Sequence, residues 1–359
     1  MARGPGVVAS EASQRGGMVP GPRLSASDIV DALRSHDLLR LGEAADAVRA
    51  RLHPDGIVTY VIDRNINYTN VCVSGCLFCA FHRREGDPDA YVLSREELGR
   101  KIEETLRLGG TQVLIQGGLH PGLDLGFYEE TFRFIKGFGV HIHGLSPPEI
   151  VHIARLEGLS VHDCIARLRD AGLDTIPGGG AEILCDRVRR QVSPRKCTKA
   201  EWLGVMRAAH GIGMRTTATM MFGHVETPED AVEHLLAVRD LQDETGGFTA
   251  FIPWTFQPAN TALGGRPVGG FAYLRMLAVC RLALDNIANV QASWVTQGGH
   301  VAQIALRFGA NDMGSTMIEE NVVAAAGCSH RLPKEEIVRL IEAAGFRARQ
   351  RDCYYNCLE

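Results

Sequence analysis

The chain has 359 residues, of which 45% are hydrophobic and 22% charged, and its formal net charge is −4. This balance is typical of a globular protein with a large core, and it argues against nucleic acid or an anionic membrane as the main partner. No apolar run reaches the roughly 18–20 residues that a membrane-spanning helix needs. Ten cysteines scattered along the chain, without an apolar signal segment, favour a reducing, cytoplasmic location over a disulfide framework.

The N-terminal part of the chain divides into a tail and a helical extension. Residues 1–23 are rich in Gly, Pro, Ala and Ser, so we expect a flexible tail there. Two short helices are predicted at 27–35 and 37–52, within an extension that spans 24–56. The β-branched and aromatic residues at 57–67 then predict extended chain.

Strand and helix patterns alternate through the rest of the chain. Capping sequences such as Ser94-Arg-Glu-Glu97 open several of the helices. The alternation predicts an α/β fold in which a parallel sheet is covered by helices, a (β/α)8 barrel or a partly open TIM-like barrel at 57–315. A C-terminal helical extension is expected at 316–359. The predicted strands lie at 112–116, 140–143, 173–176, 215–222, 248–254 and 290–296, and the predicted helices at 94–106, 125–136, from 146, 198–212, 227–243, 271–286, 301–308 and 334–344.

Three closely spaced cysteines, Cys72, Cys76 and Cys79, follow the first predicted strand as C-x3-C-x2-C. Thiolates are the usual ligands of iron–sulfur clusters, and three of them leave one iron of a four-iron cluster without a protein ligand. Such an open position lets a metal bind a substrate or cosubstrate. Zinc motifs usually supply their ligands as two pairs, which are not found here. A zinc or iron–sulfur scaffold without activity remains the alternative from a different class.

Further candidate residues lie where predicted strands end, and each also has a simpler explanation. Gly117 and Gly118 would let the backbone approach a ligand, or they form a plain turn. Glu182 can accept hydrogen bonds from hydroxyl or ammonium groups, or it lies at an exposed helix start. Ser146 caps a helix and could also face a ligand. His141 and His143 alternate along a strand and so face the same side, as a metal pair or, more simply, lining the barrel mouth or capping helices. His224 and Glu226 lie where a strand meets its loop, in proton transfer, substrate binding or a structural role.

Several segments of the chain resemble the radical S-adenosylmethionine (SAM) superfamily. Within it they resemble the group that contains futalosine-pathway enzymes of menaquinone synthesis and components of deazaflavin (F0) synthase, and most of all the cyclic dehypoxanthinyl futalosine synthases. The resemblance covers almost all residues from about 38 to 354. It is carried by 63–72, 78–81, 117–121, 221–227, 251–258, 292–298 and 309–316.

The resemblance implies a [4Fe–4S] cluster on the three cysteines and SAM bound beside it. The SAM contacts it implies are Phe78, Gly117, Gly118, Ser146 and Glu182. The common glycine motif of the superfamily ends in Glu, whereas this chain has Leu119, so backbone carbonyls would make that contact. Candidates for the SAM carboxylate are Arg187, Arg195 and Lys196, among which the sequence does not choose.

The implied reaction is a radical cyclisation. Reductive cleavage of SAM gives an adenosyl radical, which removes the C4′ hydrogen of dehypoxanthine futalosine, and the new carbon radical closes onto the benzoate ring. Partners implied are this nucleoside-derived benzoate and an electron donor such as a flavodoxin or ferredoxin. Arg215, Arg275 and Arg307 are candidates for the substrate carboxylate, and the sequence indicates no catalytic base. Aminofutalosine synthase and an F0-synthase component are the alternatives within the superfamily.

Overall fold

The computed structural model describes residues 23–358, so the expected tail falls almost entirely outside the described part of the chain. The two expected helices are present as α1 (Ala26–Arg34) and α2 (Leu38–Leu52). Their starts are fixed by side-chain caps: Ser25 forms a capping box with Asp28, and Asp37 accepts a hydrogen bond from the third residue of α2.

No helix among residues 23–358 is both long enough and apolar enough to cross a membrane.

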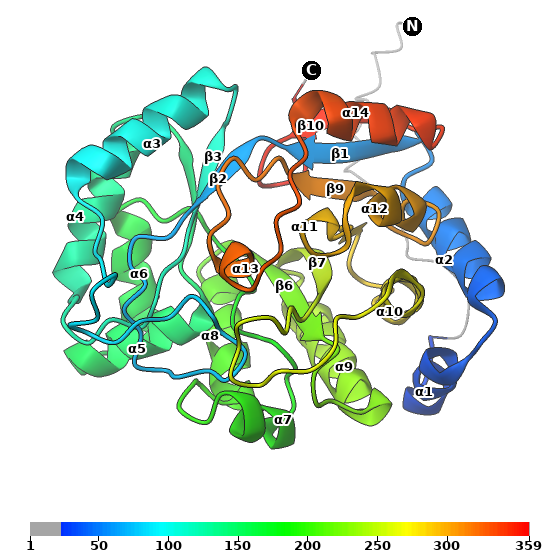
Figure 1. Cartoon of the computed structure of the whole chain (residues 1–359), viewed down its shortest axis with the longest axis horizontal. Helices are drawn as coiled ribbons and strands as arrows, with labels where there is room; N and C mark the ends of the chain where they lie inside the picture. Colours follow the sequence, from blue (N-terminus) through cyan, green and yellow to red (C-terminus); the bar gives the residue numbers. More distant parts are fainter. Residues whose placement is uncertain (1–22, 359) are drawn as a thin grey trace, which may run out of the picture.

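A curled sheet of seven parallel strands forms the centre of the molecule (Figure 1). Its strands follow one another in chain order, which is the arrangement expected of a partly open TIM-like barrel, and the predicted fold class is confirmed. The strands are β2 (Asp63–Ile66), β3 (Gln112–Ile115), β4 (His141–Gly144), β5 (Thr175–Ile176), β6 (Arg215–Phe222), β7 (Phe248–Thr255) and β8 (Asn289–Val290).

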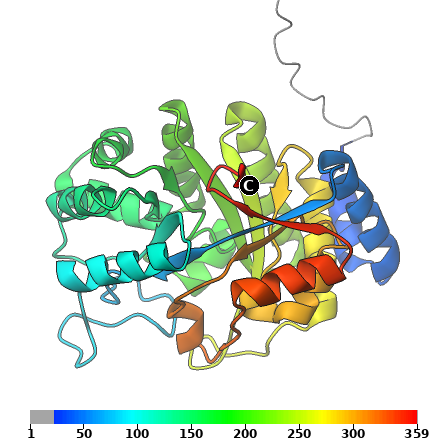
Figure 2. The same ribbon diagram turned by 90° about the horizontal axis from the view of Figure 1, so that it is seen from above.

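Helices cover the outer face of this sheet, and their apolar sides fill the core with it (Figures 1 and 2). Ile66, Val113 and Ile142 on neighbouring strands are fully buried, as are Phe132 and Trp202 on covering helices. The helices between strands are α3 (Arg95–Arg107), α4 (Leu125–Lys136), α5 (Pro147–Glu157), α6 (Val161–Asp170), α7 (Asp186–Val192), α8 (Lys199–Gly211), α9 (Pro228–Thr245), α10 (Gly270–Ala283), α11 (Trp294–Gln297) and α12 (Gly299–Ala305). The sequence patterns did not predict α6 and α7.

The extended segment predicted at 57–67 is split between two sheets. Its first half, β1 (Ile57–Val61), pairs in parallel with β9 (Asp312–Ser315) and β10 (Arg347–Arg351), and Figure 2 shows β10 running beside β1. A single parallel bridge from Gln291 to Asp312 connects the end of the main sheet to β9. The chain beyond β8 therefore returns to the side of the barrel where β2 begins.

The C-terminal segment is not only helical. It contains α13 (Val322–Ala325) and α14 (Lys334–Ala343), but also β10 and the short β11 (Cys357–Leu358). The prediction missed β10 because three of its five residues are arginines, which read as a solvated surface. The strand predicted at 290–296 is also partly wrong: it ends at Val290, and the buried Trp294 begins α11. The domain boundaries at 57 and 315 stay predictions.

A buried ion pair joins the C-terminal strands to the barrel. The guanidinium of Arg351 donates to both carboxylate oxygens of Asp312, at 2.6 and 3.0 Å, and the Thr59 hydroxyl donates to the same carboxylate at 2.5 Å. Both charged side chains are at most 6% exposed. These contacts connect β1, β9 and β10 from the interior.

We predict that Arg351→Leu lowers the free energy of unfolding by about 3–5 kcal/mol, because it leaves the buried Asp312 carboxylate without its counter-charge. The measurement is the urea unfolding midpoint. Arg339→Leu is the control, since Arg339 forms an exposed pair with Glu336 on α14. Equal, small changes in the two variants would contradict the importance of the buried pair.

Candidate functional site

The cysteine loop lies over the carboxyl ends of β2 and β3. Backbone bonds fix it: the Cys72 N–H donates to the Arg83 carbonyl at 2.9 Å, and the Val73 N–H donates to the Leu119 carbonyl at 3.0 Å. All three cysteines are free thiols, and all three line one cavity of about 220 Å³. The spacing in the sequence therefore corresponds to thiols that share one space.

The surroundings of these thiols differ. Burial raises the pKa of Cys76 to about 11. Burial acts in the same direction on Cys79, but hydrogen bonds from His82 outweigh it and the pKa is lowered. Since a metal is held by the thiolate, binding has to displace the proton of Cys76.

The donor set fits an iron–sulfur cluster in its chemistry, because thiolates are the usual ligands of such clusters. Within residues 23–358, no three His, Cys, Asp or Glu side chains are arranged to hold one metal ion. The three thiols instead stand around a space that a larger group can occupy.

Gly117 and Gly118, at the end of β3, line the same cavity. They also allow the cysteine loop to pack closely against β3. A Cβ at Gly118 would lie 2.1 Å from the carbonyl oxygen of Val71, and a Cβ at Gly117 would lie 2.6 Å from the Tyr68 ring. The absence of side chains thus lets the cysteine loop pack onto β3. The glycine signal in the sequence has a structural cause in addition to any ligand contact.

Glu149 is a residue of this site that the sequence indicated only as a helix cap. Its side chain is buried and accepts from the Gly117 N–H at 3.0 Å and the Tyr68 hydroxyl at 2.9 Å. Its other oxygen accepts from the Ser146 N–H at 2.7 Å, the bond that belongs to the capping box of α5, and from the Ser146 hydroxyl at 2.5 Å. Ser146 both caps the helix and lines the cavity. Glu149 therefore links the glycine turn to the start of α5.

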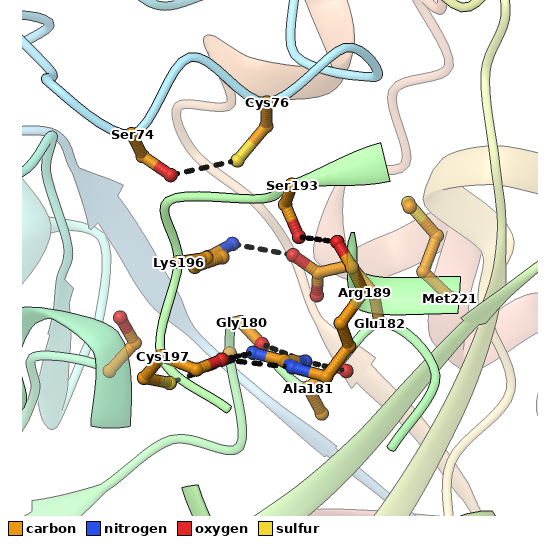
Figure 3. A network of polar contacts seen from close by, with 12 residues as sticks. Ser74, Cys76, Gly180, Ala181, Glu182, Arg189, Ser193, Lys196, Cys197 and Met221 are labelled. Atoms are coloured by element: carbon orange, nitrogen blue, oxygen red, sulfur yellow. Dashed lines mark hydrogen bonds and ion pairs between the residues drawn. The ribbon is translucent and has the colours of Figure 1, made fainter. Parts of the chain in front are cut away.

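Glu182 also lines the cavity, where its carboxylate forms an ion pair with Lys196 (Figure 3). The Lys196 ammonium lies 2.5 Å from the Glu182 carboxylate and 5.3 Å from the centre of the Phe78 ring. Burial alone would raise the pKa of Glu182, but the charge of Lys196 keeps it below its usual value, so the carboxylate is ionised.

Of the three cations considered for the SAM carboxylate, only Lys196 lines this cavity. Arg187 is paired with Asp230 on α9, and Arg195 donates to the Ser74 carbonyl at 3.3 Å. Lys196 is therefore the one of these three cations that lies at the cavity, where it is paired with Glu182, and its contact with SAM stays a prediction.

A second cavity of about 280 Å³ fills the interior of the barrel and adjoins the first. Asp63, Gln112 and His143 contribute to its wall from three neighbouring strands, and Arg351 and Tyr355 from the C-terminal segment. Four residues line both cavities, so the two spaces meet at their positions: Gln116, Gly179, Trp254 and Val322.

The arginines considered for the substrate carboxylate lie elsewhere. Arg215 donates to the Gly246 carbonyl at the start of β6, and Arg307 donates to the Ala344 carbonyl. Arg275 lies on α10 and, like the other two, lines neither of the two cavities. Their role toward the substrate carboxylate stays a prediction, because sequence position does not show which end of the barrel an arginine faces.

The histidine candidates separate into two cases. His141 and His143 lie on the same side of β4, as expected, and both bond the Thr175 hydroxyl, at 2.8 and 2.7 Å. Burial lowers the pKa of His143 to about 3, so this ring, which lines the larger cavity, is neutral. Both ring nitrogens of His224 are bonded to backbone groups, of Val225 and Met221, which is a structural role.

Two known protein families match most of the chain. Residues 66–238 match the family described as the radical SAM superfamily, and residues 245–359 match the CofH/MqnC C-terminal region. The chain is 45% identical to the cyclic dehypoxanthine futalosine synthase of Streptomyces coelicolor, over 94% of this chain and 86% of that protein. It is equally identical to the synthase of Halalkalibacterium halodurans, over 95% and 93% of the two chains.

The chain belongs to the radical SAM superfamily. It is a radical SAM enzyme, and its cofactors are a [4Fe–4S] cluster and SAM. When bound, these cofactors supply a 5′-deoxyadenosyl radical by reductive cleavage of SAM.

The fold of this radical SAM enzyme is shared with solved structures of low sequence identity. Methylornithine synthase superposes with a TM-score of 0.72 at 21% identity, over 91% of this chain and 95% of the other. A hydrogenase maturase, HydG of Carboxydothermus hydrogenoformans, gives 0.72 at 18% identity, over 93% and 77%. A related function is named for an archaeal protein: the 5-amino-6-(D-ribitylamino)uracil–L-tyrosine 4-hydroxyphenyl transferase of Archaeoglobus fulgidus is 43% identical over 88% and 92% of the two chains.

We predict that Gly118→Ala lowers both the iron content after anaerobic reconstitution and the unfolding midpoint. The added methyl group meets the Val71 backbone, so the cysteine loop has to move away from β3. Gly204→Ala is the matched control, because a Cβ at this position of α8 meets nothing within 4 Å. If the two variants bind equal iron and unfold at the same urea concentration, the packing argument is wrong.

Proposed function

We propose that this radical SAM enzyme is a cyclic dehypoxanthine futalosine synthase of menaquinone biosynthesis. In this proposal the C4′ hydrogen of dehypoxanthine futalosine is abstracted and the C4′ radical attacks the benzoate ring. Loss of a proton, and of one electron to a one-electron acceptor such as the oxidised redox protein proposed below, would restore the aromatic ring. The observation that carries the proposal is the 45% identity to two such synthases along nearly the whole length of both partners.

We assign the cofactor contacts to the smaller cavity. Cys72, Cys76 and Cys79 would hold the cluster. SAM would contact the other residues predicted from the sequence: Phe78, Gly117, Gly118, Ser146 and Glu182. The support is that every one of these residues lines the same cavity, although they come from loops far apart in the sequence.

The larger cavity is proposed to hold the substrate. A carbon radical has to meet its target at near-contact distance and away from water. The two cavities share Trp254 and Val322 as lining residues, so ligands bound in them would lie next to one another. Val322 lies on α13, whose short turn stands in front of the barrel strands in Figure 1.

The electron for reductive cleavage is proposed to come from a small redox protein such as a flavodoxin or ferredoxin. Val73 and Leu77, beside the cluster cysteines, are 43% and 38% exposed, so the outer face of the loop is accessible to such a donor.

A second candidate function follows from the archaeal relative, which is named as a transferase that uses tyrosine and 5-amino-6-(D-ribitylamino)uracil. At 43% identity it is nearly as similar as the synthases, so cofactor chemistry alone does not separate the two. The substrates separate the two functions, because SAM is the only substrate that the two reactions share.

We predict that Cys76→Ala abolishes both the iron–sulfur absorbance and the formation of 5′-deoxyadenosine, since two thiolates cannot hold the cluster. Absorbance, iron content and product are measured after anaerobic reconstitution. Cys357→Ala is the control, because this exposed cysteine on β11 lies outside the cavity. Full turnover by Cys76→Ala would refute the assignment of the cluster ligands.

We predict that the reconstituted enzyme, given SAM and a strong reductant, converts dehypoxanthine futalosine to a cyclised product with release of 5′-deoxyadenosine. Parallel reactions contain tyrosine with 5-amino-6-(D-ribitylamino)uracil, and products are identified by mass spectrometry. If only tyrosine and 5-amino-6-(D-ribitylamino)uracil are converted, the enzyme is the transferase and not the cyclase. A further reaction contains the enol ether substrate of aminofutalosine synthase, and a product there that retains the adenosyl group would indicate that enzyme.

A further inference from the structure

Arg189 on α7 is a buried arginine whose hydrogen bonds go to backbone carbonyls of two loops. It is 3% exposed, and it forms no ion pair with a carboxylate among residues 23–358. Its Nη1 donates to the carbonyls of Gly180 at 3.1 Å and Ala181 at 2.6 Å, and its Nε donates to the carbonyl of Cys197 at 2.9 Å. Burying a charge in this way is costly unless its donors are satisfied, as they are here.

The two loops held by Arg189 carry the two members of the cavity ion pair. Ala181 directly precedes Glu182, and Cys197 directly follows Lys196. Figure 3 shows the guanidinium beneath the pair, with its bonds spread over the neighbouring backbone. Arg189 does not line the cavity itself, so it can act on a ligand only through these neighbours.

The backbone at Glu182 needs such support. Glu182 has a φ of +43° and follows Gly180 with a φ of +73°, so two left-handed residues stand close together. A residue other than glycine in this region is strained, and it persists only where surrounding contacts hold it. The bonds from Arg189 fix the peptides before Glu182, and the Met221 N–H donates to the Glu182 carbonyl at 3.0 Å.

The same segment also contacts the cysteine loop. The carbonyl of Val192, at the end of α7, accepts from the Leu77 N–H at 2.9 Å. Arg195 donates to the Ser74 carbonyl at 3.3 Å, and the Lys196 ammonium lies over the Phe78 ring. Residues 189–197 therefore touch both sides of the smaller cavity.

We propose that Arg189 is a positioning residue for SAM: it fixes Glu182 and Lys196 at a set place relative to the cysteine loop. This inference rests on the proposed assignment of Glu182 to SAM. An arginine suits the task because its planar fork donates in several directions at once, whereas a lysine offers a single nitrogen. Arg189 also adds a positive charge near Glu182, which helps to keep that carboxylate ionised while Lys196 adjusts to a ligand.

The test compares the SAM affinity of cluster-loaded Arg189→Lys with that of the wild type, by anaerobic equilibrium dialysis. The substitution keeps the charge but removes most of the fork, so we expect the dissociation constant to rise by about tenfold, which corresponds to about 1.4 kcal/mol. Iron and sulfide per chain stay at wild-type values. The spectral change of the reduced cluster on SAM addition requires correspondingly more SAM.

Arg281→Lys is the matched control. Arg281 is fully buried on α10 and likewise donates to backbone carbonyls, of Gly309 at 2.8 Å and Ala288 at 2.9 Å, but it lines neither cavity. A general effect of disturbing a buried arginine would appear in both variants. If Arg189→Lys binds SAM as tightly as Arg281→Lys, the inference is overturned.

Glu182→Gln separates this inference from the proposed site. If Glu182→Gln weakens SAM binding and Arg189→Lys does not, only the role of Arg189 falls; if neither does, the assignment of Glu182 falls with it. If Arg189→Lys fails to fold, amide hydrogen exchange of the wild type, measured with and without SAM, tests the inference instead. Addition of SAM should protect the amides of 180–182 and 192–197 together, and protection of the first segment alone would contradict the coupling.

Discussion

The site depends on how the loop with Cys72, Cys76 and Cys79 is fixed at the end of the barrel. Nothing within a short loop by itself forces three free thiols to converge on one space. Backbone bonds from its residues reach Leu119 after β3, Val192 at the end of α7 and Leu263 after β7. Three separate segments thus hold it, and each follows a strand of the same sheet. The convergence of the thiols is therefore a property of the whole barrel.

The two cavities also depend on buried charges that are paired with one another. Glu182 and Lys196 pair at the smaller cavity, and Asp312 and Arg351 pair beneath the larger one. Each pair joins segments that lie on different elements. Its loss therefore leaves a buried charge unpaired and also removes a contact between two parts of the cavity wall. The first pair lines the smaller cavity and Arg351 of the second lines the larger one, while Trp254 and Val322 line both.

The sequence predicted the parts of this arrangement that depend on local signals. Capping boxes such as Ser94 with Glu97 located helix starts, apolar runs located β3, β6 and β7, and the cysteine spacing indicated the cluster. The shared position of Gly117, Ser146 and Glu182 after strands placed them near one another, because the carboxyl ends of parallel strands meet at one edge.

Other parts depend on contacts between distant segments, which local patterns do not contain. The arginines of β10 resembled a solvated surface until the pairing with β1 and Asp312 was known. Lys196 could not be told from Arg187 or Arg195, because their partners lie on different elements. Glu149 and Arg189 have ordinary helical surroundings in the sequence, and only the folded chain shows that they hold the turns of the cavity.

The central claim is that the cluster held by this loop has one iron open to SAM in the cavity that Glu182 lines. Electron–nuclear double resonance of the reduced enzyme, with SAM labelled with nitrogen-15 at the methionine amine, tests it most directly. A nitrogen-15 coupling to the cluster is the predicted result. Reduced, cluster-loaded enzyme that binds the labelled SAM without any such coupling would contradict the account.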